Sequence, residues 1–135
     1  MKTRIVITGS LRWEDRIKIK DLIFNLKTKL KDDLQIISGG LKVGVDSYVK
    51  KFCMEFAVNF AEFPPYDSIW TQYCEEPAWK FNKLHKKRFI FMRNDNMIKN
   101  ADALIIFKLS EDNSVVLDDL IKKANKKNKK IVIRN

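Results

Sequence analysis

The chain has 135 residues, of which 45% are hydrophobic and 11% aromatic. This length suits one domain with one core, and this composition excludes wholesale disorder. Lysine and arginine number 27 against 17 aspartates and glutamates, which gives a formal net charge of +10. Such a charge is compatible with nucleic acid, with an anionic ligand or merely with a soluble surface.

The same sequence argues against membranes and metals. No apolar run is long enough to span a bilayer, and the apolar start of the chain is too short for a signal peptide, so a cytoplasmic protein is the default expectation. Cys53 and Cys74 have no Cys or His neighbour at metal-ligand spacing, and the single histidine, His85, lies among lysines. Because metal sites need three or four converging ligands, we expect no metal and no cofactor.

Strands and helices are predicted to alternate along the chain. Apolar runs with β-branched residues indicate strands, and apolar residues at helical spacing indicate helices. In chain order these are strand 4–8, helix 14–31, strand 34–38, helix 45–56, strand 59–63, helix 81–100, strand 103–109, helix 117–124 and strand 131–133. Residues 66–79 are expected to form a partly ordered loop over a sheet edge. The alternation predicts an α/β fold, a single Rossmann-like doubly wound domain over 1–135 with a mainly parallel sheet of about five strands.

All four glycines fall in two short segments that each follow a predicted strand. In the first, Gly9 permits a turn, Ser10 offers a hydroxyl and Arg12 is able to pair with a phosphate. Trp13 either stacks on a base or packs against the sheet. The alternative is an ordinary strand-to-helix turn with a capping serine.

The second segment runs from Ser38 to Asp46 and contains Gly39, Gly40 and Gly44, with Lys42 between them. It matches neither the dinucleotide pattern GxGxxG nor a P-loop. Paired glycines followed by a third at a helix start nevertheless expose backbone N–H groups to an anion. Asp46 would lie in the first helical turn, where a carboxylate is favourable, so a structural role is favoured over a catalytic one.

A third candidate segment lies within the predicted helix 81–100. Arg93 and Asn94 occupy one helical turn there and would reach a ligand at the carboxyl edge of the sheet. The alternative is a solvated charged face, as for most such runs.

Taken in order, these motifs resemble the YspA-like branch of the SLOG superfamily. The matching pieces are Gly9-Ser10, Arg12-Trp13, Ser38 to Asp46, Phe63-Pro64, Arg93-Asn94 with Met97, and Ala101-Asp102. The superfamily includes the Lonely Guy phosphoribohydrolases, the DNA-processing protein A group and sensor domains for nucleotide-derived signals. The resemblance implies a Rossmann-like fold, a nucleotide-type ligand over the two glycine loops with Arg93 facing it, and a homo-oligomer.

One stretch departs from the hydrolase branch of that superfamily. The branch has Pro-Gly-Gly-x-Gly-Thr after the fourth strand and a glutamate soon after it, whereas residues 109–116 contain no glycine. Ser114 stands where the threonine hydroxyl is expected. A loop without glycine brings its backbone less closely to a phosphate, which weakens the expectation of glycosidic hydrolysis.

Three functions follow, in order of preference. The first is binding of a nucleotide or nucleotide-derived signal, with phosphate on the amides of Gly39, Gly40 and Gly44 and with help from Ser10, Arg12 and Lys42. The second is N-glycosidic hydrolysis of nucleoside monophosphates, for which Asp46, Glu111 and Asp112 are candidate carboxylates and no catalytic residue is assigned. The third is single-stranded nucleic-acid binding through lysines and Trp70, Tyr73 and Trp79. The aromatic segment from Trp70 to Trp79 is also expected to lie under a partner subunit or a lid.

Overall fold

Five short apolar runs pair into one sheet. In the computed structural model, which describes residues 2–135, they are β1 (Thr3–Gly9), β2 (Leu34–Ser38), β3 (Asn59–Glu62), β4 (Ala103–Phe107) and β5 (Lys130–Arg134). Their order across the sheet is β3-β2-β1-β4-β5, and every neighbouring pair is parallel. The predicted α/β fold with a parallel five-stranded sheet is therefore confirmed.

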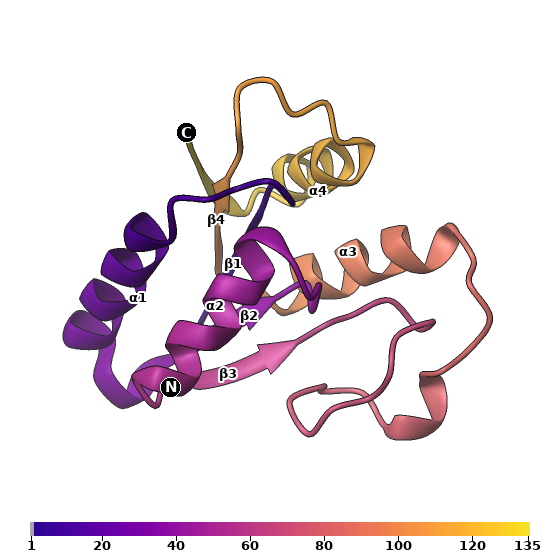
Figure 1. Cartoon of the computed structure of the whole chain (residues 1–135), viewed down its shortest axis with the longest axis horizontal. Helices are drawn as coiled ribbons and strands as arrows, with labels where there is room; N and C mark the ends of the chain where they lie inside the picture. Colours follow the sequence, from indigo (N-terminus) through magenta and orange to yellow (C-terminus); the bar gives the residue numbers. More distant parts are fainter. Residues whose placement is uncertain (1) are drawn as a thin grey trace.

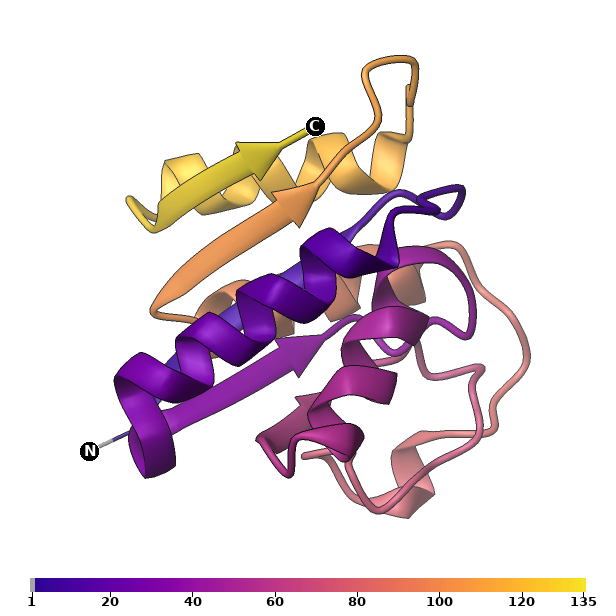
Figure 2. The ribbon, with the colours of Figure 1, turned by 60° about the vertical axis from the view of Figure 1, so that its left-hand side comes forward.

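Four helices connect the strands and cover both faces of the sheet. They are α1 (Arg16–Leu30), α2 (Gly44–Glu55), α3 (Arg88–Asn100) and α4 (Val115–Lys126), with short 3₁₀ turns η1 (Lys31–Asp33) and η2 (Ala78–Lys80). Figure 1 shows the arrangement of these elements, and in Figure 2 α1 and α2 lie in front of the sheet while α3 and α4 lie behind it. The molecule is thus a three-layer sandwich.

Alternation along the central strand divides the core into two halves. Ile5 and Ile7 of β1 belong to the cluster under α1 and α2, whereas Val6 belongs to the cluster under α3 and α4. Successive side chains of a strand point to opposite faces, so a continuous apolar run is what a strand buried on both sides requires. The edge strand β5 differs, because its outer positions Lys130 and Arg134 are exposed.

The helix predicted over 81–100 is shorter than expected. Regular helix begins only at Arg88. Asn82 has a φ of 60°, which an α-helix does not permit, and its amide donates to the carbonyl oxygen of Ser68. Leu84, within this stretch, is 87% exposed and so does not pack against the sheet. Anchoring to residues 66–68 therefore overrides the helical spacing of this stretch.

The aromatic segment 66–79 follows the edge of the sheet beside β3. Glu62 and Cys74 form an isolated parallel bridge, and the Glu62 amide donates to the Tyr73 carbonyl. The hydroxyl of Tyr66 donates to the carboxylate of Glu76 on this segment. Trp79 is 73% exposed. That a partner subunit or a lid covers the part from Trp70 to Trp79, and that the protein forms a homo-oligomer, stay predictions.

Among residues 2–135, none of the helices is both long enough and apolar enough to cross a membrane.

The close contact between β1 and β4 yields a test of the fold. Gly9 lies opposite Phe107, and a Cβ at Gly9 would overlap the Phe107 carbonyl oxygen and lie 2.8 Å from a methyl carbon of Val45. We expect Gly9→Ala to lower the free energy of unfolding by about 2 kcal/mol or more, measured by urea denaturation. Leu11→Ala, at an exposed position two residues on, should change it by about 0.5 kcal/mol or less. An equal effect of both would contradict the close-approach argument.

Candidate functional site

Three loops meet at the carboxyl edge of the sheet, where the strand order reverses. β1 is followed by a loop that leads to α1, β2 by one that leads to α2, and β4 by one that leads to α4. The chain moves from β1 to β2 on one side and later returns to β4 on the other. Such a reversal opens a crevice outside the strand ends, which is where open parallel sheets bind ligands.

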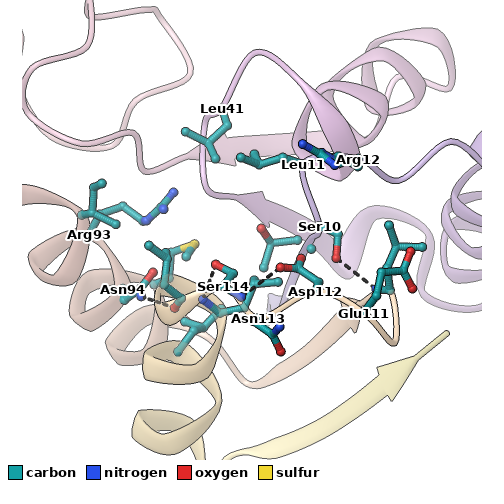
Figure 3. A pocket seen from close by; sticks show the side chains of 18 residues that line it. Ser10, Leu11, Arg12, Leu41, Arg93, Asn94, Glu111, Asp112, Asn113 and Ser114 are labelled. Atoms are coloured by element: carbon teal, nitrogen blue, oxygen red, sulfur yellow. Dashed lines mark hydrogen bonds between the residues drawn. The ribbon is translucent and has the colours of Figure 1, made fainter.

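A cavity of about 630 Å³ occupies this edge. Its walls come from the loop after β1, from α3, from the loop after β4 and from the start of α4, as Figure 3 shows. The lining residues that carry polar side chains are Thr8, Ser10, Arg12, Arg93, Asn94, Glu111, Asp112, Asn113 and Ser114. Apart from Gly9, the other lining residues are apolar, so the cavity combines polar groups with an apolar wall.

The structure brings together about half of the site residues expected from the sequence. Six of them line this cavity: Gly9, Ser10, Arg12, Arg93, Asn94 and Ser114. Seven do not: Trp13, Ser38, Gly39, Gly40, Lys42, Gly44 and Asp46. Gly40 and Lys42 instead border a second cavity of about 670 Å³, which Leu41 shares with the first.

Ser10 ties the three loops together. Its amide donates to the Phe107 carbonyl at 2.9 Å, and its hydroxyl oxygen accepts from the Leu109 amide at 3.0 Å. Its carbonyl accepts from the amides of Trp13 and Val45. Only 1% of Ser10 is exposed. Its side-chain oxygen is therefore used to hold the loop after β4 in place.

The glycine-loop amides are used by the protein itself, which corrects the expectation of an open anion cradle. The Gly40 amide donates to the Ser38 hydroxyl at 3.1 Å, and the Leu41 amide donates to Asp46 Oδ2 at 3.3 Å. Thr8 donates to Asp46 Oδ1 at 2.6 Å. Several backbone amides of this loop are thus already paired within the protein, including that of Gly39 with Asp46, and phosphate binding at Gly39, Gly40 and Gly44 stays a prediction.

Asp46 is 2% exposed, which fits the structural role favoured from the sequence. Burial raises the pKa of its carboxyl, while Arg93 and the hydrogen bonds from Thr8, Leu41 and Gly39 oppose that rise. Asp46 does not line the cavity that Glu111 and Asp112 line. Of the three carboxylates considered for hydrolysis, only those of Glu111 and Asp112 line this cavity.

Gly44 packs directly against the backbone of the loop after β1. Its φ is 67°, and a Cβ there would overlap the backbone of Ser10 and Leu11. Glycine is the residue that adopts this conformation without strain and lets two loops touch. Gly44 brings the two glycine loops together, and the Val45 amide then reaches Ser10.

Arg93 stands between the cavity and this buried carboxylate. It is 5% exposed, and its Nη1 donates to the Gly39 carbonyl at 2.6 Å. Burial lowers the pKa of its guanidinium, and Asp46 opposes that change. A Cβ at Gly39 would overlap Nη1 and lie 2.8 Å from Asp46 Oδ2, so glycine is needed for Arg93 to reach this place.

Trp13 takes the packing alternative. It is 4% exposed, and its ring meets Phe107 edge to face with centroids 5.2 Å apart. Its indole N–H donates to the Asp15 carbonyl at 2.8 Å. Trp13 is therefore a core residue that anchors the loop after β1.

Sequence reasoning missed most of the apolar wall. Leu11, Leu41, Ile90, Met97 and Leu109 line the cavity, and nothing in their spacing sets them apart from ordinary core positions. The exposure of Leu11 is the feature that distinguishes it, and exposure is visible only in three dimensions.

Two polar atoms in this wall lack partners. Among the buried side-chain nitrogens and oxygens of residues 2–135, Arg93 Nε and Asn94 Oδ1 have no hydrogen-bond partner. Both residues line the cavity and follow one another on α3. Buried polar atoms are nearly always paired, so two orphans side by side need an explanation.

Comparison with known proteins bears on the fold. A scan against protein-family models finds no match, and a search of curated proteins finds none either. The chain is similar to the molybdenum cofactor binding protein of Rippkaea orientalis, with a TM-score of 0.73 and 13% identity over 98% of this chain and 76% of that one. It is also similar to two structures of the molybdenum cofactor carrier protein of Chlamydomonas reinhardtii, with TM-scores of 0.70 and 0.71 and 15% identity over 98% and 99% of this chain and 76% of each of those. At such identities the likeness shows a shared Rossmann-like fold.

The buried carboxylate yields a second test. Asp46→Asn keeps the shape of the side chain but removes the negative charge that faces the buried Arg93. We expect it to lower the free energy of unfolding by about 2–5 kcal/mol in urea denaturation. Asp21→Asn, on the exposed face of α1, serves as the matched control and should have little effect. Full stability of Asp46→Asn would remove Asp46 from its structural role.

Proposed function

We propose that this protein binds a nucleotide-type small molecule, a nitrogen heterocycle that carries a phosphate, in the cavity at the carboxyl edge of the sheet. The observation that carries the proposal is the pair of orphaned polar atoms on Arg93 and Asn94 in the cavity wall. A ligand that supplies an acceptor to one and a donor to the other would remove a penalty that the ligand-free protein bears.

The phosphate is assigned to the arginine side of the cavity. Arg12 is exposed, and Arg93 keeps an unused Nε–H, so both are able to make charge-assisted hydrogen bonds to anionic oxygens. The first turn of α4 is a less suitable place, although helix starts favour anions. There the Ser114 amide already donates to Asp112 Oδ1 at 2.9 Å, and a second anion would meet that carboxylate.

The heterocycle is assigned to the apolar wall. Met97, Leu117 and Leu120 are buried residues of that wall, and an apolar wall favours the faces of a ring over a charged group. A volume of about 630 Å³ falls in the range of roughly 300–1,000 Å³ that is usual for small-molecule sites. The cavity therefore suits a ligand of nucleotide size rather than a single ion.

Two further lines support a small-molecule ligand. Proteins of similar fold are described as binding or carrying molybdenum cofactor, which favours a small cofactor-like ligand in a fold of this kind. The motif resemblance to the YspA-like branch of the SLOG superfamily points to a nucleotide-derived ligand. The nucleic-acid alternative has less support, because Tyr73 packs edge to face on Phe60 and is not free to stack on a base.

Hydrolysis remains a second candidate because of one observation. Glu111 and Asp112 line the same cavity as Arg12 and Arg93, which places carboxylates beside the proposed ligand. A carboxylate so placed is able to activate water or to stabilise the cationic sugar that forms as an N-glycosidic bond breaks.

The phosphate assignment predicts the effect of one exposed arginine. Arg12→Ala should weaken the binding of adenosine or guanosine 5′-monophosphate about tenfold in isothermal titration calorimetry. Binding of the phosphate-free nucleosides should not change. Lys42→Ala, which removes the same charge outside this cavity, is the matched control and should leave the dissociation constants within about twofold. If neither nucleotide binds the folded wild-type protein, the proposed function is wrong.

Chromatographic detection of free base distinguishes a protein that only binds the nucleotide from one that hydrolyses it. If the protein only binds, incubation with nucleoside monophosphates should release no free base. Release of base that is lost in Asp112→Asn but kept in Asp118→Asn would instead establish the hydrolase. Asp118 is exposed on α4 and does not line the cavity, so it controls for the loss of one negative charge nearby.

A further inference from the structure

The amide of Asn94 has a fixed orientation. Its Nδ2 donates to the Val116 carbonyl at 3.0 Å and to Asp119 Oδ2 at 3.1 Å. Turning the amide over would set Oδ1 against these two oxygens and lose both hydrogen bonds. Oδ1 is therefore held as an acceptor that points away from both of these partners on α4.

That acceptor has no donor within the described protein. The cavity wall that Asn94 shares includes Met97, Leu117 and Leu120, whose side chains carry no N–H or O–H. Asn94 is fully buried, so the missing bond costs more than it would at the surface. A donor brought by the ligand is the partner that this atom lacks.

Arg93 and Asn94 call for opposite partners. The Nε–H of Arg93 is a donor and suits an oxygen, whereas Asn94 Oδ1 is an acceptor and suits an N–H or O–H. A phosphate group at neutral pH offers acceptors and would leave Oδ1 unpaired. A ligand that pairs both atoms therefore carries a hydrogen-bond donor on the part that enters the apolar wall, which is the part assigned to the ring.

The depth of Oδ1 narrows the kind of donor. Because Asn94 is fully buried, the atom lies behind the cavity surface, and a group that protrudes from a ring reaches it more easily than a ring N–H does. Met97 lies three residues further along α3, hence on the same face, and also lines the cavity. Its unbranched, flexible side chain is able to move aside for such a group.

We propose that Asn94 Oδ1 accepts a hydrogen bond from an exocyclic amino group of the ligand, so that the site selects amino-substituted heterocycles. This inference rests on the proposed function, because it concerns the ring of a ligand bound in the same cavity. Sites built to bond a polar group reject analogues that lack it far more strongly than apolar sites reject a missing methylene.

The test uses two pairs of nucleotides that differ by one amino group. Guanosine and inosine 5′-monophosphate differ at the 2-position, and adenosine and purine riboside 5′-monophosphate differ at the 6-position. Calorimetry of the wild-type protein with all four should show, for at least one pair, that the amino-bearing member binds about tenfold or more tightly.

A variant then assigns the preference to this residue. In Asn94→Leu, which has a similar size and no acceptor, that ratio should fall to about one through weaker binding of the amino-bearing member alone. Asn96→Leu makes the same substitution two residues along α3, outside the cavity, and should preserve the ratio. Thermal melting establishes that each variant is folded, and Asn94→Ala replaces Asn94→Leu if the latter is not.

Each result has one meaning. Equal affinities within both pairs, or a ratio that persists in both Asn94 variants, would overturn the inference and leave the proposed function standing. Failure of both adenosine and guanosine 5′-monophosphate to bind the folded wild-type protein would overturn the proposed function and this inference with it.

Discussion

The buried carboxylate of Asp46 connects three segments at the carboxyl edge of the sheet. It accepts from Thr8 at the end of β1 and from Leu41 in the loop after β2, and it faces Arg93 of α3. Three segments far apart in the sequence thus converge on one buried charge. Taking such a charge out of water is costly unless hydrogen bonds and an opposite charge compensate it, and this centre has both. The position of Arg93 at the cavity follows from this arrangement.

The charge of the cavity differs from that of the chain. The net charge is +10, yet the ionisable residues that line the cavity are two arginines, Arg12 and Arg93, and two acids, Glu111 and Asp112. The lysines that produce this positive charge therefore lie outside the cavity. A neutral lining does not favour a polyanion, so overall charge is a poor guide to what this cavity binds.

The strands and the layers were predictable because their cause is local. Alternating buried faces require apolar runs such as that of β4, and helical spacing requires amphipathic stripes such as that of α4. The stretch from Phe81 to Lys87 was not predictable, since its backbone follows hydrogen bonds to Tyr66 and Ser68 rather than its own spacing.

Part of the candidate site could be predicted from the sequence. Arg93 and Asn94 line the same cavity as Gly9 and Ser10 of the first glycine segment, and the binding of a ligand there stays a proposal. The sequence does not reveal that the Leu41 amide donates a hydrogen bond to Asp46. Which acceptor pairs with a given backbone N–H depends on tertiary packing. The unpaired Asn94 Oδ1 likewise cannot be predicted from the sequence, because it depends on which residues of α4 bind the Asn94 Nδ2.

The exposed ends of β5 limit how this protein can associate with itself. If two copies extended the sheet by antiparallel pairing of β5 about Val132, Lys130 of each would lie directly opposite Arg134 of the other. Like charges placed opposite one another across a strand pair repel, and charged edge strands commonly prevent such edge-to-edge pairing of sheets. Pairing of two copies through β5 in this register is therefore disfavoured.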